Sequence, residues 1–247
     1  MAGENRIVLG AHRSGVTAAE SLSQDMLYRL LTWFSPAYPI GAFSYSSGIE
    51  WAVEAGDVNS TETLRAWLES MLNCGVGINE GIFFSQIHRA VGCDDAAAMV
   101  EIAELAATFA PTRERYVETT TLGRAFMEVT QAAWPCAALT TLVALWGGPI
   151  AYPVAAGAAC AGHRIPLEPA LLAFLTALCA NWVSAGVRLI PLGHTDSQCV
   201  LSALEPALTA STNRALAARL DDVASATFRA DIASARHETQ YTRLFRS

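Results

Sequence analysis

Apolar residues recur every three or four positions along nearly the whole chain, and this spacing constrains the fold more than any other feature. A helix with that period presents a continuous apolar face, whereas a half-buried strand alternates apolar and polar residues. No stretch shows sustained alternation with enrichment in β-branched residues. We therefore predict an all-α fold, with helices at about residues 22–34, 44–54, 60–71, 76–91, 94–109, 113–132, 137–146, 151–161, 168–189, 195–209 and 213–219.

The predicted helices follow one another without a Ser/Gly-rich or Pro-rich linker, so we expect a single-domain helical bundle. Residues 1–20 are interpreted as a flexible leader, because they offer one short apolar cluster and lack the form of a signal peptide. The bundle then covers residues 21–235, and residues 236–247 form a tail. Alanine and glycine on many helix faces let helix axes approach closely, which suits a compact bundle and also a helix-mediated homodimer.

The segment 170–187 is almost wholly apolar and about as long as the roughly 20 residues that a membrane crossing requires. Its high alanine content, together with Asn181 and Ser184, favours a buried core helix instead. We expect no membrane association. A membrane-associated helical protein that uses this segment is kept as an alternative.

The chain contains no lysine, which excludes several classes of enzyme. All 16 of its Lys and Arg residues are arginines. A P-loop needs a lysine to reach the outer phosphates of a nucleotide, and Schiff-base enzymes need a lysine amine as nucleophile. The net charge of -7 and the lack of a basic run argue against a nucleic-acid partner.

Cysteine and histidine show no catalytic or metal-binding spacing. The 6 cysteines lie far apart among small apolar residues, as expected of reduced side chains in a cytoplasmic protein. The 5 histidines are isolated, and the H-E-x-x-H and G-x-S-x-G motifs are missing. We expect no catalytic residue, no metal and no cofactor. A cofactor-independent helical enzyme of unknown substrate is the second alternative.

The tail, residues 236–247, interleaves apolar side chains such as Tyr241 and Phe245 with arginines. Such groups near a chain end stay in water unless a surface receives them, and Tyr and Arg are common anchors of protein interfaces. Two interpretations follow. The tail folds back on its own domain, or it docks on a partner that offers acidic or carbonyl groups to the arginines.

A second unusual string runs from Pro39 to Glu50, where a loop with Phe43, Tyr45 and several hydroxyl groups passes into a helix. In the structural interpretation Gly41 supplies a turn and Ser44 caps the helix. Tyr45, Ile49 and Trp51 then pack into the core.

Two further stretches carry charge. Arg188 ends an otherwise apolar helix, where it serves either the helix dipole or a partner surface. The run 112–118, Thr-Arg-Glu-Arg-Tyr-Val-Glu, mixes charges at helical spacing, which is typical of a solvated helix face with weak ion pairing.

Together these strings resemble the UreF family of urease accessory proteins. The tail reads His-Glu-Thr-Gln-Tyr-Thr-Arg-Leu-Phe-Arg-Ser, which looks like the carboxy-terminal signature of that family. The string Pro39–Glu50 matches its amino-terminal pattern. Residues 187–198 resemble a third segment, with His194 where the pattern has glutamine, and residues 112–123 are similar to a fourth.

The resemblance implies an all-α, homodimeric urease maturation factor that acts by binding. It implies that the chain engages the accessory protein UreD, also called UreH, and that this pair recruits the GTPase UreG for nickel insertion into apo-urease. The residues implied to bind UreD/UreH are Arg236, His237, Glu238, Tyr241, Arg243, Leu244, Phe245 and Arg246. Those implied to lie on or near the surface offered to UreG are Pro39, Gly41, Ser44, Tyr45, Ser46, Glu50 and Arg188.

Overall fold

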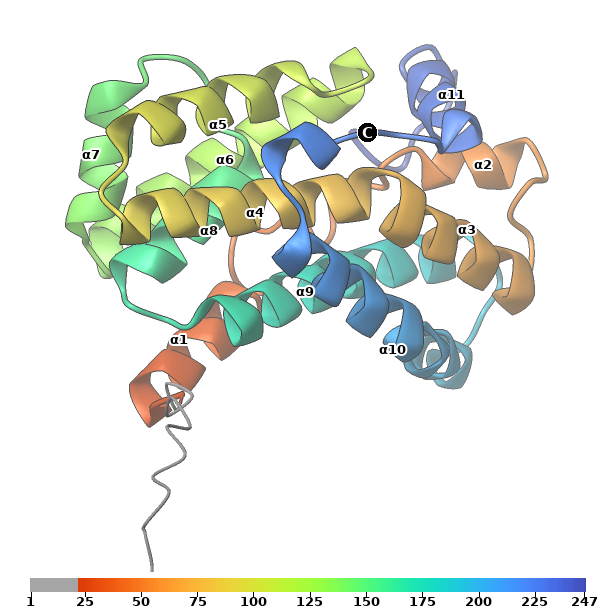
Figure 1. The fold of residues 1–247 in the computed structure, drawn as a ribbon. Coiled ribbons are helices and arrows are strands. Elements are labelled where there is room, and N and C mark those ends of the chain that lie inside the picture. Colours follow the sequence, from red (N-terminus) through yellow and green to blue (C-terminus); the bar gives the residue numbers. More distant parts are fainter. Residues whose placement is uncertain (1–21) are drawn as a thin grey trace, which may run out of the picture.

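The computed structural model describes residues 22–247, and within them it is all-helical, as predicted. The predicted leader, together with Ser21, lies outside the described residues. The elements in chain order are α1 (Gln24–Trp33), α2 (Ile49–Glu54), α3 (Thr61–Cys74), α4 (Val76–Gly92), α5 (Ala96–Thr108), α6 (Arg113–Ala133), α7 (Ala137–Leu145), α8 (Tyr152–Gly162), α9 (Leu167–Leu189), α10 (His194–Ala217), the short 3-10 helix η1 (Leu220–Asp222) and α11 (Phe228–His237) (Figure 1).

Side-chain caps set the start of several helices. The Ser23 hydroxyl accepts from the Met26 nitrogen at the start of α1. Ser60 and Thr63 satisfy each other's main-chain nitrogens at the start of α3. These bonds satisfy donors that the first turn of a helix leaves without an intrahelical acceptor.

Helix α4 lies at the centre of the bundle, where it packs against α3, α5, α8, α9 and α10 (Figure 1). Its Phe84 ring contacts the Phe174 ring of α9 at 5.0 Å between centroids, and Phe174 in turn contacts Tyr152 of α8 at 5.2 Å. Phe126 of α6 lies 5.7 Å from Tyr152. Aromatic contacts of this kind, two of them tilted and one edge-on, fix the relative rotation of the helices around one apolar core.

Two glycines allow close backbone contacts between neighbouring segments. Both contacts involve α8 or the residues just before it. A Cβ on Gly157 of α8 would lie 2.7 Å from the carbonyl oxygen of Phe84. A Cβ on Gly123 of α6 would lie 2.0 Å from the carbonyl oxygen of Ile150. No side chain fits at either position, so glycine allows the backbones to meet.

Helix α9 contains the apolar segment that could be taken for a membrane span. It is the one described helix that is long and apolar enough to cross a membrane by length and composition alone. Its neighbours α1, α2, α3, α4, α8 and α10 cover it, and 56% of its most apolar 18-residue window is buried. This environment is that of a core helix, as the sequence favoured.

The second helix begins later than the sequence predicted. Helix α2 starts at Ile49 and not near Ser44, because Ser47 and Gly48 have positive φ angles of 54° and 84°. A right-handed helix does not pass through two such residues. Most of the string Pro39–Glu50 is therefore loop.

The end of the chain holds two further differences. The helices predicted at 195–209 and 213–219 are one helix, α10, which passes through Pro206. Two polar residues in the predicted gap belong to this helix: Ser211 donates to the Leu72 carbonyl oxygen of α3, and Thr212 donates to the Leu208 carbonyl oxygen.

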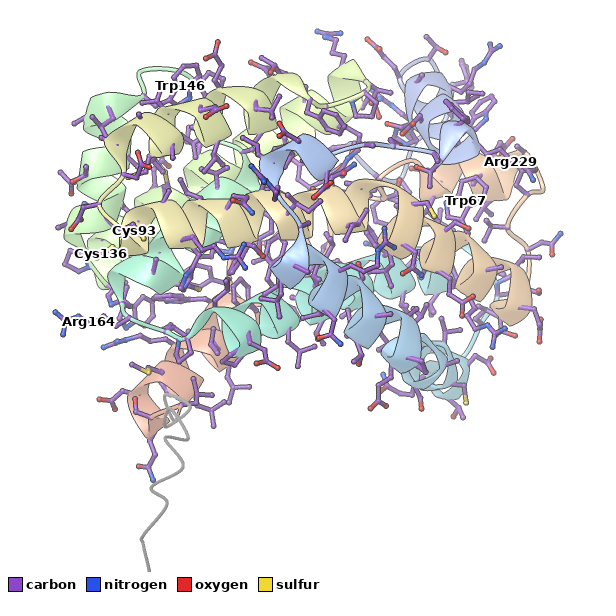
Figure 2. The ribbon with its side chains drawn as sticks, in the orientation of Figure 1. Trp67, Cys93, Cys136, Trp146, Arg164 and Arg229 are labelled. Carbon is purple, nitrogen blue, oxygen red and sulfur yellow. The ribbon has the colours of Figure 1, made fainter. Side chains whose placement is uncertain are left out.

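Helix α11 was not predicted from the sequence. Its large apolar residues, Phe228 and Ile232, face outward, and it buries Ala233, Ser234 and His237 instead. On its outer side Arg229 lies over the Trp67 ring of α3, 6.0 Å from the centroid, at one end of the bundle (Figure 2).

Candidate functional site

The loop between α1 and α2 receives α11 directly. A Cβ on Gly48 would meet the main-chain nitrogen of Ser234 at 2.7 Å, so only glycine lets the helix lie there. Gly48 also has a positive φ, which glycine adopts without strain. The contact brings the residues after α11 onto residues 44–50.

His237, the last residue of α11, is fully buried between two carboxylates. Its Nδ1 lies 2.5 Å from Oε2 of Glu114, and its Nε2 lies 2.9 Å from Oε2 of Glu50. Carboxylate oxygens accept, so both contacts are satisfied when each ring nitrogen carries a proton. The three side chains join α11 to the first turns of α2 and α6.

Glu50 also binds the main chain of the tail. The nitrogens of Leu244 and Phe245 donate to its two carboxylate oxygens at 2.6 and 2.9 Å. Arg243 donates to Oε1 of Glu114 at 2.9 Å. Because hydrogen bonds to ionised acceptors are about twice as strong as neutral ones, these contacts fix the path of the tail.

The last two residues form main-chain hydrogen bonds with the loop. The Arg246 nitrogen donates to the Ser44 carbonyl oxygen at 2.8 Å, and the Ser46 nitrogen donates to the Ser247 main-chain oxygen at 2.5 Å. The Ser46 hydroxyl donates to the same oxygen at 2.6 Å. The Ser247 hydroxyl donates to Oε2 of Glu118 at 2.6 Å, which ties the tail to α6.

Beneath these contacts, Arg115 of α6 holds the polar core together. It donates to Oε1 of Glu80 at 2.7 Å and to the Ser47 hydroxyl at 2.8 Å. It also forms an ion pair with Glu118 at 2.5 Å. Ser47 completes the set, since it accepts from Nε1 of Trp182 at 3.0 Å and donates to Oε1 of Glu118 at 3.0 Å.

The expectation that the run 112–118 forms a solvated helix face is therefore wrong for its key residues. Glu114, Arg115 and Glu118 are only 7%, 6% and 5% exposed. They lie on the face of α6 that the loop and tail cover, where each of the three side chains has a hydrogen-bond or ion-pair partner. We name the buried set the tail–loop cluster. It consists of Ser46, Ser47, Glu50, Glu114, Arg115, Glu118, His237 and Ser247.

Glu80 and Glu118 share one guanidinium, and their surroundings shift the pKa of the groups involved. Burial raises the pKa of Glu80 to about 7, against the lowering effect of Arg115 and with a further rise from Glu118. Burial opposes the charge of Arg115, but the two carboxylates together outweigh it, so the pKa of Arg115 is raised. The arginine therefore stays ionised.

Arg188 joins the same assembly from the end of α9. Its Nη1 donates to the Phe43 carbonyl oxygen at 3.2 Å, and its guanidinium carbon lies 4.6 Å from the centroid of the Phe245 ring. The side chain thus connects the loop and the tail across an exposed surface. His194 is exposed at the start of α10.

Some of the other residues predicted to bind partners are exposed, and others are buried. In the tail, Tyr241 and Leu244 project into solvent, at 104% and 55% exposed, whereas Phe245 is 3% exposed. The exposed charged tail residues are Arg236, Glu238, Arg243 and Arg246. In the loop, Pro39, Gly41 and Ser44 are half-buried, whereas Tyr45, Ser46 and Glu50 are buried.

Sequence reasoning missed Glu80 and Trp182 and gave Ser247 no role. A usable signal existed for Glu80, because it is a lone carboxylate within the apolar residues 76–84. Such a residue needs a buried cation. Nothing local distinguishes Trp182 or Ser247, whose partners are far away in the chain.

No cluster of three or more His, Cys, Asp or Glu side chains in residues 22–247 is arranged to hold a metal. The pair of carboxylates around His237 is already occupied by donors. The arrangement fixes a segment of chain in place, and its groups bind one another.

Comparison with known proteins agrees with the resemblance noted in the tail and the loop. The UreF family model matches residues 58–205. The urease accessory protein UreF of Rhodopseudomonas palustris (strain HaA2) is 58% identical over 90% of this chain and 93% of its own length. The protein of the same name from Bradyrhizobium sp. (strain ORS 278) is 57% identical over 94% of this chain and 96% of its own length. The chain belongs to the UreF family of urease accessory proteins.

Proposed function

We propose that this chain is a non-catalytic urease maturation factor of the cytoplasm. In this role it binds UreD/UreH and recruits and regulates UreG for nickel insertion into apo-urease. It acts as a homodimeric chaperone, without a cofactor, and binds neither nucleic acid nor membrane. Family membership supports the assignment, since the relatives are named urease accessory proteins.

The observation that carries the proposal is the division of the tail into anchored and exposed side chains. His237, Phe245 and Ser247 are buried, whereas Tyr241 and Leu244 lie between or beside them in solvent. A segment fixed at both sides loses little further conformational freedom when it binds. Tyrosine is also among the residues that most often dominate binding energy. We therefore assign Tyr241 and Leu244 to the contact with UreD/UreH, and His237 and Phe245 to holding them in place.

The corner formed by Arg188 and Phe43 is the surface we assign to UreG. Phe43 is 65% exposed beside the guanidinium, so an aromatic and a cationic group lie together in solvent. An arginine supplied to the GTP of a partner can accelerate hydrolysis as a finger. Arg188 is already engaged by Phe43 and Phe245, which favours a docking role instead. If Arg188→Ala leaves complex-stimulated GTP hydrolysis unchanged while it weakens binding, the finger role is excluded.

The experiment that tests the proposal is co-purification of the full chain with UreD/UreH and UreG, with light scattering on each product. We expect the free chain at twice its mass of 26.3 kDa. The variant Tyr241→Ser/Leu244→Ser removes exposed apolar area only, so it should fold normally. We expect it to weaken UreD/UreH binding by at least about tenfold.

The matched control is Val143→Ser/Leu172→Ser, which alters two apolar residues that are 50% and 41% exposed away from the tail. It should bind as the unaltered chain does. Equal binding by the tail variant and the unaltered chain would contradict the proposed interface. A truncation after Ala235 is less sharp, because it also removes His237 and leaves Glu50 and Glu114 without their shared partner.

A further inference from the structure

A cavity of about 250 Å³ lies beside the tail–loop cluster, between α4, α5, α6 and the residues that lead into α11. Its walls are largely apolar. They include Phe83, Ala106, Phe109 and Pro153. Ala110 and Asp231 are only half-buried and mark the rim through which a ligand can enter.

Glu80 lines this cavity, and one of its two carboxylate oxygens has no hydrogen-bond partner in the described part of the chain. Its Oε1 binds Arg115, but its Oε2 has no hydrogen-bond partner among residues 22–247. The residue is only 7% exposed. A buried carboxylate oxygen without a donor is costly, which marks the position as one that a ligand donor can satisfy.

The charges around the cavity are also unbalanced. Arg115 alone faces the two carboxylates of Glu80 and Glu118, at 2.7 and 2.5 Å, so one negative charge stays uncompensated when both are ionised. A third carboxyl, Asp231, lines the same cavity. Burial raises its pKa, against the lowering effects of the Ser225 hydrogen bond and the Arg115 charge.

We propose that this cavity binds a small organic cation, an ammonium or guanidinium group on a short apolar carrier, with the free oxygen of Glu80 as its charged partner. The apolar walls exclude a fully hydrated ion, and the carboxylates exclude an anion. A neutral ligand of the same shape leaves the extra charge unpaired. The proposed role in urease maturation does not require this site, and the two can fail separately.

The cavity volume of about 250 Å³ lies just below the usual range of about 300–1,000 Å³ for ligand pockets. The apolar part of the ligand is therefore small. A free amine and the Lys or Arg side chain of a partner protein share the required chemistry. Probes of each kind therefore have to be compared.

The test is calorimetric titration of the full-length protein with n-butylammonium, with n-butanol and with the peptide acetyl-Leu-Lys-Leu-amide. We expect the ammonium to bind in the millimolar range or tighter and the alcohol at least about tenfold more weakly. Tighter binding of the peptide assigns the site to a partner side chain, and tighter binding of the free amine assigns it to a metabolite. Equal binding of alcohol and ammonium, or no binding of either cation, overturns the proposal.

Two variants localise the site. Glu80→Gln keeps the shape and the contact with Arg115 but removes the charge, and we expect affinity for the ammonium to fall about 30-fold. Glu104→Gln on the exposed face of α5 is the matched control and should bind normally. Ala110→Phe fills the rim without altering a charge, so it abolishes binding even if Glu80→Gln perturbs the fold. Unchanged affinity in Ala110→Phe overturns the assignment to this cavity.

The pH dependence gives an independent readout. Glu80 is surrounded by Arg115 and Glu118 of α6 and by Tyr152 of α8, and Asp231 of α11 lines the same cavity. With its pKa at about 7, the carboxyl binds a proton in competition with the ligand. Affinity should be about tenfold weaker at pH 6 than at pH 8. Glu80→Gln should remove this dependence, and a dependence that survives in the variant contradicts the proposed partner.

Discussion

The contact of α8 and its preceding residues with α4 and α6, and the contact of the tail with the loop, are both buried but are built from opposite chemistry. The first is made largely by Gly123, Gly157 and alanines, with the Thr119 hydroxyl accepting from the Tyr152 main-chain nitrogen at 3.2 Å. The second contains four carboxyl groups, if Glu80 is counted, around Arg115 and His237. An apolar contact depends on shape alone. A polar one depends on every partner being present, because each unpaired group costs free energy when it is buried.

This difference indicates how each contact responds to change. A larger side chain at the close contact of α8 lowers the global free energy of unfolding, since any added atom displaces a backbone. The tail–loop cluster can open locally, because residues 238–247 make no helix of their own and are held by individual hydrogen bonds. The bundle is thus a rigid body with a segment whose attachment is conditional.

The largest expected effect comes from breaking the shape of the apolar contact. Gly123→Val places a Cβ 2.0 Å from the carbonyl oxygen of Ile150, and that neighbour is backbone and cannot swing away. We expect a loss of at least about 4 kcal/mol in the free energy of unfolding, measured by urea denaturation. Gly92→Ala at the end of α4 is the control, since its added Cβ meets nothing within 4 Å. If Gly123→Val unfolds at the same urea concentration as the control, the close contact does not exist.

The next effect tests whether the polar contact needs every partner. Arg115→Met keeps an unbranched apolar stem but removes the guanidinium, which leaves Glu80 and Glu118 buried without a cation. Breaking a buried pair in this way costs about 3–5 kcal/mol. The adjacent Arg113→Met removes an exposed ion pair with Glu238 and should cost less than about 1 kcal/mol. Equal unfolding free energies for the two variants would show that Arg115 is not buried between its carboxylate partners.

The pH dependence of stability sharpens the comparison, because Glu80 of the polar contact has a pKa of about 7. The pKa of Glu80 rises from 4.5 to about 7 on folding, so the folded state holds an extra proton between these values. This group therefore destabilises the fold progressively as pH rises from about 4.5 to about 7. Between pH 5 and pH 8, the stability of Glu80→Gln relative to the unaltered chain should improve by about 2–3 kcal/mol. A constant difference across that range would mean that the pKa of Glu80 is not raised.

The same contrast explains what the sequence could predict. The apolar period predicted the helices that pack through their apolar faces, including α4 and α9. It failed for α11, whose large apolar residues point outward and whose buried face carries Ser234 and His237. It failed also at residues 44–48, where the backbone angles of Ser47 and Gly48 depend on the chain that covers them.

Local sequence motifs indicated which segments form the site but not which of their side chains contact one another. Local patterns drew attention to the tail, the loop and the run 112–118, yet treated that run as solvated. The partners of Arg115 lie at Glu80 and Ser47, in other elements, so spacing along α6 could not reveal them. Whether a charged helix face is buried depends on which distant segment covers it, and a single sequence contains no signal for that pairing.

The smallest effect tests the conditional attachment of the tail at one atom. Ser247→Ala removes the hydroxyl that donates to Glu118 at 2.6 Å but keeps the main-chain bonds to Ser46. A hydrogen bond to a charged acceptor contributes about 1.5 kcal/mol, so local opening should become about tenfold more frequent. Hydrogen exchange at the amides of Ser46 and Arg246 should speed up by that factor, while core amides in α4 stay unchanged. Thr242→Ala, an exposed neighbour, is the control. If the core amides accelerate equally, the tail is not a separately opening unit, and the distinction between a rigid bundle and a conditional attachment fails.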